Sequence, residues 1–213
     1  MQTESFDFAG PAGRLEAILM RPEGAPVAAA VVCHAHPLQG GVMHFKVVFR
    51  AAKALQHEGL AALRFNFRGV GRSHGVHDQG RGEQDDVRAA LDELERRFAA
   101  LPLVLGGFSF GSNMALRVAA VDERPRAALA MGFPLRMMEA GPFVEQVHVP
   151  RLFVQGENDT FASGAEMEAL VARLPPPRHL VVVPGADHFF AGHLDELQKA
   201  VSDWFQGRPW LPA

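Results

Sequence analysis

The residue with the clearest chemical potential is Ser109, which stands between two glycines in the order Gly107-Phe-Ser-Phe-Gly111. An apolar run of strand character precedes this serine, and a helical pattern follows it. A serine on so sharp a strand-to-helix turn is held in a strained backbone conformation with its hydroxyl pushed outward, and the glycines let strand and helix approach closely. The setting predicts a nucleophile. The alternative is a glycine-rich turn whose serine merely caps the helix, because the pentapeptide alone is common.

A serine nucleophile needs a base, and a histidine base needs an acid that fixes its tautomer. Asp159 lies in Gly156-Glu-Asn-Asp159, directly after one predicted strand, and His188 lies in Gly185-Ala-Asp-His188, after the last predicted strand. The chain order serine, aspartate, histidine is that of the hydrolases with a nucleophile elbow. We therefore predict a catalytic triad of Ser109, Asp159 and His188.

Neighbouring groups compete for the acid and base roles. Glu157 and Asp187 are the alternative acids, and His193 is the alternative base. Glu157 stands closer to its strand, where a carboxylate more readily binds backbone, and His193 falls inside a predicted helix. Taken singly, Asp159 could begin a helix and His188 could be a surface residue. All three residues in order at strand ends favour the triad.

Acyl transfer also requires amide donors that stabilise the developing oxyanion. The N–H of Phe110, directly after the serine, is the first expected donor. The second is expected from the loop after the first buried strand, His34-Ala-His-Pro-Leu-Gln-Gly-Gly41. Because Pro37 has no N–H, Leu38 is the predicted second donor, with Gln39 as the alternative.

The apolar pattern predicts strands that alternate with helices. Such alternation implies a mostly parallel sheet covered on both faces, in one α/β domain that spans residues 1–213. Ligands bind beyond the carboxyl ends of the strands in these sheets, which is where the candidate residues fall. The predicted strands are Ser5–Ala9, Leu15–Met20, Ala28–His34, Leu60–Asn66, Leu101–Phe108, Ala127–Gly132, Arg151–Gln155 and His179–Val183, and the predicted helices are Met43–Glu58, Glu83–Ala99, Ser109–Glu123, Gly164–Leu174 and Ala191–Phe205.

Composition argues against several classes of function. A hydrophobic content of 48% with 21% charged residues is that of an ordinary soluble globular protein. The net charge of −3 gives no support for binding to nucleic acid or to an acidic membrane surface. The single cysteine, Cys33, cannot form an internal disulfide. No signal-peptide pattern begins the sequence, and no apolar stretch approaches the roughly 20 residues of a membrane span. We expect a cytoplasmic protein.

Two patterns suggest a cofactor or a metal, and both have simpler explanations. Gly69-Val-Gly-Arg-Ser-His74 begins like a dinucleotide fingerprint but lacks the third glycine and the following helix. His34, His36 and His44 suggest a metal site, but no clustered carboxylates complete the ligand set. We expect neither a cofactor nor a metal. The long loop Phe67–Gly82 also carries arginines that could attract an anionic substrate, although a solvated loop is the favoured explanation: Arg68, Arg72 and Arg81.

With these motifs the sequence resembles the α/β-hydrolase superfamily, in particular the small lid-less bacterial members that are carboxylesterase-like or dienelactone-hydrolase-like. The resemblance extends from the first hairpin to the last helix. It implies an eight-stranded sheet whose second strand runs antiparallel. One difference is that dienelactone hydrolases use cysteine where this chain has Ser109. The matching segments, besides the pentapeptide around the serine, are His34–Gly41, Phe65-Asn-Phe-Arg-Gly-Val-Gly-Arg-Ser73, Gly156–Asp159 and Gly185–His188.

The expected activity is hydrolysis of small carboxylic esters or thioesters through an acyl-enzyme on Ser109. Relatives often insert a lid before the acid-bearing strand, but Phe133–Pro150 is too short for a cap domain, so the site should be open. Phe133, Met137 and Phe161 are candidate substrate contacts, unless they simply pack beneath the loops. The alternatives are amide or peptide cleavage, another acyl transfer, or a binding protein with an idle triad. A small-molecule ester is the expected partner, and the sequence does not distinguish a monomer from a homodimer.

Overall fold

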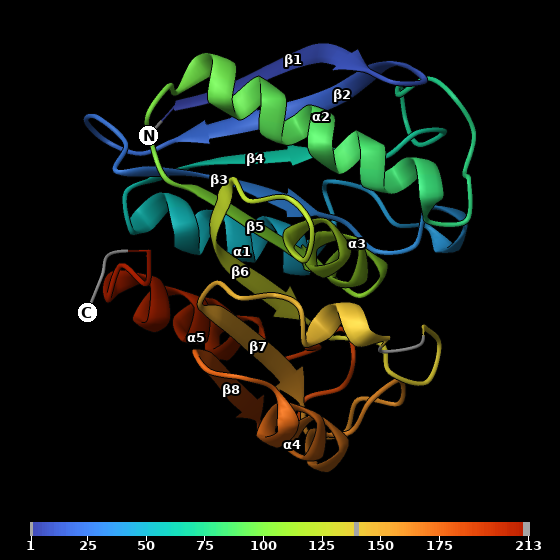
Figure 1. Cartoon of the computed structure of the whole chain (residues 1–213), viewed down its shortest axis with the longest axis vertical. Coiled ribbons are helices and arrows are strands. Elements are labelled where there is room, and N and C mark those ends of the chain that lie inside the picture. Colours follow the sequence, from blue (N-terminus) through green and yellow to red (C-terminus); the bar gives the residue numbers. More distant parts are fainter. Residues whose placement is uncertain (1, 139–140, 211–213) are drawn as a thin grey trace.

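An eight-stranded sheet runs through the molecule and carries helices on both faces (Figure 1). The computed structural model describes residues 2–138 and 141–210. The strands stand in the order β1-β2-β4-β3-β5-β6-β7-β8 across the sheet. They are β1 (Gln2–Gly10), β2 (Gly13–Arg21), β3 (Ala28–Cys33), β4 (Leu60–Phe65), β5 (Leu103–Phe108), β6 (Pro125–Met131), β7 (Arg151–Gly156) and β8 (Arg178–Val183).

The second strand runs opposite to all the others. β2 pairs antiparallel with β1 on one side and with β4 on the other, whereas the remaining neighbours pair parallel. The predicted fold, a mostly parallel eight-stranded sheet with an antiparallel second strand, is therefore confirmed. The carboxyl ends of β3 to β8 consequently share one edge of the sheet.

Within residues 2–138 and 141–210, five α-helices cover the sheet, and each packs an apolar stripe on one face. Residues of α1 and α5 share a core with one side of the strands, while residues of α2, α3 and α4 share a core with the other side. Because both faces are covered, β3, β4, β5 and β7 are buried at every position. The helices are α1 (Lys46–His57), α2 (Arg81–Arg97), α3 (Phe110–Ala119), α4 (Gly164–Arg173) and α5 (Leu194–Gln206).

Two helix starts differ from the predicted ones because of the turns that precede them. α5 begins at Leu194 rather than Ala191, because Phe190 (φ 54°) and Gly192 (φ 78°) adopt left-handed conformations that interrupt a helix. α2 begins two residues earlier than predicted, because the Glu83 carboxylate accepts the N–H of Gly80 and closes the first turn. Both starts depend on interactions that apolar periodicity does not record.

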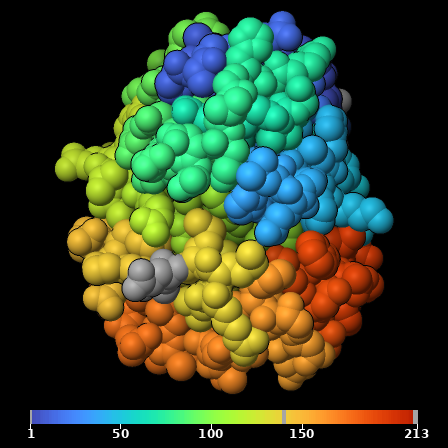
Figure 2. All heavy atoms as spheres, turned by 90° about the vertical axis from the view of Figure 1, so that its right-hand side faces the viewer, coloured from blue at the N-terminus to red at the C-terminus, as the bar shows by residue number. Residues whose placement is uncertain are grey.

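No cap domain covers the carboxyl-end edge of the sheet. Between β6 and β7, the described residues form only turns and the short 3-10 helix Pro142–Val144. Figure 2 faces this edge, where segments far apart in the sequence, coloured blue, green, yellow and red, lie side by side. In the part of the chain that the structure describes, the helices are also too short or too polar to cross a membrane.

Candidate active site

Ser109 occupies the turn between β5 and α3, as predicted. Its backbone has φ 53° and ψ −120°, a conformation that costs a residue with a side chain on the order of 1–3 kcal/mol. The N–H of Ser109 donates to the carbonyl of Met131 on β6 over 2.9 Å, and its carbonyl accepts the N–H of Ser112 in α3 over 2.9 Å. The neighbouring strand and the helix therefore hold the strained serine in place.

The two flanking glycines are required by close approach. A Cβ on Gly107 would lie 2.3 Å from the carbonyl oxygen of Gly111 across the turn. A Cβ on Gly111 would lie 2.4 Å from the carbonyl oxygen of His34 and 2.5 Å from that of Cys33. A larger residue at position 107 would push the strand away from the first turn of α3, and one at position 111 would push the serine turn away from the end of β3.

The structure brings Ser109, His188 and Asp159 into one hydrogen-bonded chain. Ser109 Oγ lies 3.0 Å from His188 Nε2, and His188 Nδ1 lies 2.6 Å from Asp159 Oδ2. Asp159 is 2% exposed and His188 is 4% exposed, so both groups are shielded from water. With Asp159 ionised, Nδ1 carries the proton and Nε2 is free to accept one from the serine.

Asp159 is fixed by every hydrogen bond that its two oxygens can use. Oδ1 accepts the N–H of Phe161 over 2.7 Å and that of Ala162 over 3.3 Å. Oδ2 accepts the amide of Gln155 over 2.8 Å in addition to the histidine. Gln155 is fully buried on β7 and was not predicted as a functional residue. A polar residue directly after the apolar stretch Leu152–Val154, at the end of the strand, was the signal in the sequence.

Three phenylalanine rings surround the imidazole of His188. The ring centroids of Phe161, Phe108 and Phe189 lie 4.5, 5.0 and 5.2 Å from that of His188. Phe161 contacts the histidine edge to face, and its carbonyl accepts the N–H of Arg136 over 2.9 Å. The histidine therefore has little rotational freedom and keeps Nε2 directed at the serine.

The competing acids and base are engaged elsewhere. Glu157 Oε2 accepts the N–H of Gly185 over 2.8 Å. Asp187 Oδ1 accepts the N–H groups of Phe189 and Ala191, over 3.0 and 2.9 Å, and so shapes the turn behind His188. His193 precedes α5 and faces Glu196 over 3.6 Å. None of the three contacts the serine in the described structure.

The amides considered for the oxyanion differ in availability. Phe110 begins α3, where the helix dipole favours negative charge. The N–H of Leu38 already donates to Nδ1 of His36 over 3.2 Å, and that of Gln39 donates to the His36 carbonyl over 3.0 Å. Burial and the nearby His77 lower the pKa of His36, which keeps its ring neutral and able to accept. The amides of Leu38 and Gln39, which the sequence suggested as the second oxyanion donor, therefore stabilise their own turn.

The structure separates the three candidate substrate contacts. Phe133 is fully buried and packs edge to face on Phe153, with the ring centroids 6.2 Å apart. It belongs to the core, so its expected contact with substrate is corrected: Gln155 binds its backbone N–H and draws the segment inward. Met137 is 50% exposed, and Phe161 contacts His188 directly.

The three arginines of the predicted loop Phe67–Gly82, the last of which begins α2, are all neutralised within the fold. Arg68 forms two hydrogen bonds with the buried Asp86, of 3.0 and 2.8 Å. Arg72 pairs with Asp7 and Glu16, and Arg81 pairs with Asp78. These ion pairs hold the loop, and they leave no free guanidinium there for an anionic substrate.

His34, at the end of β3, makes a testable contribution to stability. Its Nδ1 donates to the Ala35 carbonyl over 2.6 Å, its Nε2 accepts the N–H of Phe67 over 3.0 Å, and burial lowers its pKa from 6.5 to about 4. Below pH 6.5 the unfolded chain binds a proton at this site that the folded protein refuses until about pH 4. Stability should therefore fall with pH through this window, by about 2–3 kcal/mol between pH 7 and 4.5 from this residue.

Urea unfolding at pH 7 and 4.5 measures this loss. His34→Gln retains a hydrogen-bond acceptor but does not titrate. Its loss of unfolding free energy between pH 7 and 4.5 should therefore be smaller than that of the wild type by about 2–3 kcal/mol. His57→Gln, at an exposed histidine of α1, should keep the wild-type loss. An equal loss in the wild type and in His34→Gln would contradict this assignment.

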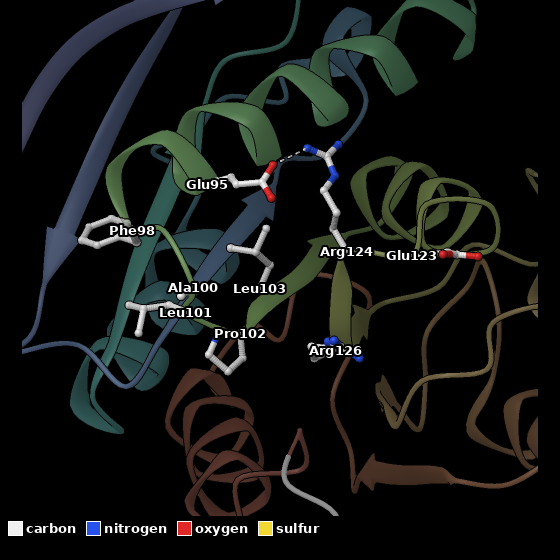
Figure 3. Close-up of a pocket in the computed structure, with 9 residues that line it drawn as sticks. All are labelled: Glu95, Phe98, Ala100, Leu101, Pro102, Leu103, Glu123, Arg124 and Arg126. Atoms are coloured by element: carbon white, nitrogen blue, oxygen red, sulfur yellow. Dashed lines mark hydrogen bonds and ion pairs between the residues drawn. The ribbon is translucent and has the colours of Figure 1, made fainter.

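A cavity of about 430 Å³ lies at the opposite edge of the sheet, at the amino ends of β5 and β6. Figure 3 shows its lining, with the Glu95–Arg124 ion pair at one side. None of its lining residues belongs to the group around Ser109. The functional-site candidate is therefore the carboxyl-end edge and not this cavity.

Comparison with known proteins identifies the family to which this fold belongs. Residues 28–201 match the family described as alpha/beta hydrolase domain. A solved alpha-beta serine hydrolase homologue from Coxiella burnetii is 38% identical, covers 95% of this chain and 97% of its own, and superposes with a TM-score of 0.89. A serine hydrolase without lid from Xanthomonas campestris, XC6422, is 34% identical over 100% of this chain and 97% of its own, with a TM-score of 0.89.

A curated relative extends the match over most of the sequence. An uncharacterized protein of Rickettsia prowazekii is 37% identical over 92% of this chain and 86% of its own length. The family match, these identities and the observed strand order all lead to one assignment. The chain belongs to the alpha/beta hydrolase superfamily, as a lid-less hydrolase of that fold.

Proposed function

We propose that this chain is a serine hydrolase that cleaves small carboxylic esters or thioesters through an acyl-enzyme on Ser109. The observation that carries the proposal is the continuous hydrogen-bonded chain from Ser109 through His188 to Asp159. A serine held at φ 53° between a strand and a helix adds to it, because that strain has no structural need unless the hydroxyl must be presented. Two similar solved proteins are also named serine hydrolases.

The reaction proceeds in two acyl transfers. Ser109 Oγ attacks the carbonyl carbon while His188 Nε2 takes its proton, and Asp159 stabilises the resulting imidazolium. The tetrahedral intermediate collapses, and the leaving alcohol or thiol receives the proton from Nε2. Water then attacks the acyl-enzyme, His188 takes a proton from the water and returns it to Ser109, and the carboxylic acid leaves.

Two backbone amides stabilise the oxyanion in this proposal. Phe110 N–H, at the start of α3, is the first. We assign the second to His36 in preference to Leu38, because the His36 amide has no acceptor among the described residues whereas the Leu38 amide is bound. The tight contact of the His34 carbonyl with Gly111 brings this loop against the serine turn.

Exposed apolar side chains around the serine favour an uncharged, apolar acyl or alkyl group. Leu38 is 74% exposed, Phe189 is 51% exposed and Met137 is 50% exposed. They lie on the loops after β3, β8 and β6. Leu38 follows His36, whose ring contacts Phe110, and the ring of Phe189 contacts His188 directly. Met137 follows Arg136, whose N–H donates to the carbonyl of Phe161 beside His188. Such side chains on one rim of a protein surface commonly mark a binding site.

The test combines labelling with turnover. A fluorophosphonate probe should label Ser109, as located by peptide mass spectrometry, and p-nitrophenyl butyrate should turn over faster than the anionic p-nitrophenyl hemisuccinate. A folded protein whose serine is not labelled would contradict the proposal and favour a binding protein. Preference for the hemisuccinate would contradict only the apolar substrate class.

A further inference from the structure

A second cavity, of about 870 Å³, lies at the amino ends of β6, β7 and β8, on the edge opposite Ser109. Its basic walls come from the start of β6, the segment before β7, the start of β8 and the chain after α5. Among the residues that the structure describes, no carboxylate belongs to the lining. The basic side chains that line it are Arg126, His148, His179 and Arg208.

Two of these side chains are unusual within this protein because they have no partner. Most arginines here donate to carboxylates or carbonyls, as Arg124 does to Asp122 over 2.7 Å. Among the described residues, three arginine side chains have neither a hydrogen bond nor an ion pair: Arg126, Arg173 and Arg208. Arg173 lines a different cavity that also contains Glu145 and Glu166. Arg126 and Arg208 share one cavity and have no acid there.

Figure 3 shows the setting of Arg126 at the start of β6. The neighbouring Arg124 reaches toward Glu95 on α2, while Arg126 is drawn without any interaction. Arg126 lines both this cavity and the neighbouring one. Because Arg124 pairs with Glu95, this carboxylate does not neutralise Arg126, and the charge of Arg126 is available to a ligand.

The chemistry of these groups fits a dianion. A guanidinium binds a phosphate through two parallel N–H bonds, and imidazoles add further donors. A phosphate monoester carries a charge of about −1.5 to −2 at pH 7, so it would neutralise both unpaired arginines. A single carboxylate would neutralise only one of them.

The remaining wall suits a planar group. Trp210 lines the cavity together with Pro150, Pro177 and Pro209, and its ring centroid lies 6.1 Å from that of Phe205. A cavity of about 870 Å³ is within the range of small-molecule sites. We propose that this cavity binds a phosphate monoester that carries a planar ring, with the phosphate on Arg126 and Arg208 and the ring against Trp210.

The probe is adenosine monophosphate, and its binding is measured by calorimetric titration at low salt. The protein used is the Ser109→Ala variant, so that turnover does not contribute to the heat. The wild-type protein should bind adenosine monophosphate with the same affinity, since the cavity is remote from Ser109. Arg126→Gln and Arg208→Gln should each weaken binding by about tenfold or more, the usual effect of losing a charged hydrogen bond. Arg173→Gln is the matched control and should bind normally. Inorganic phosphate should bind more weakly, and adenosine and acetate should not bind measurably.

Three outcomes would overturn the proposal. These are no binding of adenosine monophosphate at millimolar concentration, an equal loss in Arg173→Gln, and equal affinity for adenosine or acetate. Thermal unfolding of each variant shows that a lost signal is not lost folding. Because the readout is binding and not hydrolysis, failure here would leave the proposed activity at Ser109 untouched.

Discussion

Replacing Ser109 with alanine should abolish ester hydrolysis, with kcat reduced on the order of 10⁴-fold or more, because the attacking oxygen is gone. The loss should be confined to activity. Oγ makes one hydrogen bond, to His188 Nε2, and Asp159 holds the opposite side of that ring. Steady-state hydrolysis of p-nitrophenyl acetate measures the effect, and the fluorophosphonate label should disappear with it.

Ser202→Ala is the control for this experiment. The Ser202 hydroxyl donates to Glu58 over 2.8 Å on the outside of α5, far along the chain from the serine turn. Its removal should leave kcat unchanged. Undiminished turnover by Ser109→Ala would show that another group performs the attack, and would refute the proposed mechanism.

Asp159→Asn should lower kcat by about 10⁴-fold, the size known for a triad whose acid becomes an amide. Oδ1 accepts backbone N–H groups from Phe161 and Ala162, so an asparagine would keep its oxygen there. Its NH₂ group would then face two donors, Gln155 Nε2 and His188 Nδ1. The histidine can accept from this NH₂ only by moving its proton to Nε2, where it can no longer take one from Ser109.

The matched control is Asp187→Asn, because Asp187 was one of the two competing acids. Its carboxylate accepts two backbone N–H groups in the turn after His188 and does not reach the imidazole ring nitrogens in the described structure. It should retain kcat within severalfold, with some loss of stability in urea. A drop in Asp187→Asn as large as that in Asp159→Asn would move the acid role to position 187.

Most strands were predictable because they are apolar runs bounded by turn residues. β3, β4, β5 and β7 lie between helices on both faces, so nearly every position must be apolar, and the sequence shows it. Helix starts were less predictable. The start of α2 depends on the carboxylate of Glu83, which binds Gly80 and also lies 2.8 Å from His77.

Substrate contacts were the weakest prediction, because periodicity does not say which side of a loop faces inward. Phe133 and Met137 belong to one apolar segment, yet the first is fully buried and the second is half exposed. Gln155 decides this by binding the N–H of Phe133 from the neighbouring strand. Leu38 shows the same limit, since its amide is bound by a side chain two residues away.

The sequence by itself determined the fold class, the serine turn and the identity of the two candidate triad partners of Ser109. Local rules suffice for these, because a strained turn needs glycines and because strand ends in a parallel sheet share one edge. Only the tertiary structure decided which carboxylate reaches His188, which amides near Ser109 are free, and that Arg126 and Arg208 share one cavity. The carboxylate and the shared cavity depend on distances between segments far apart in the chain, and the bound Leu38 amide depends on the direction of the His36 side chain. Residue order shows neither.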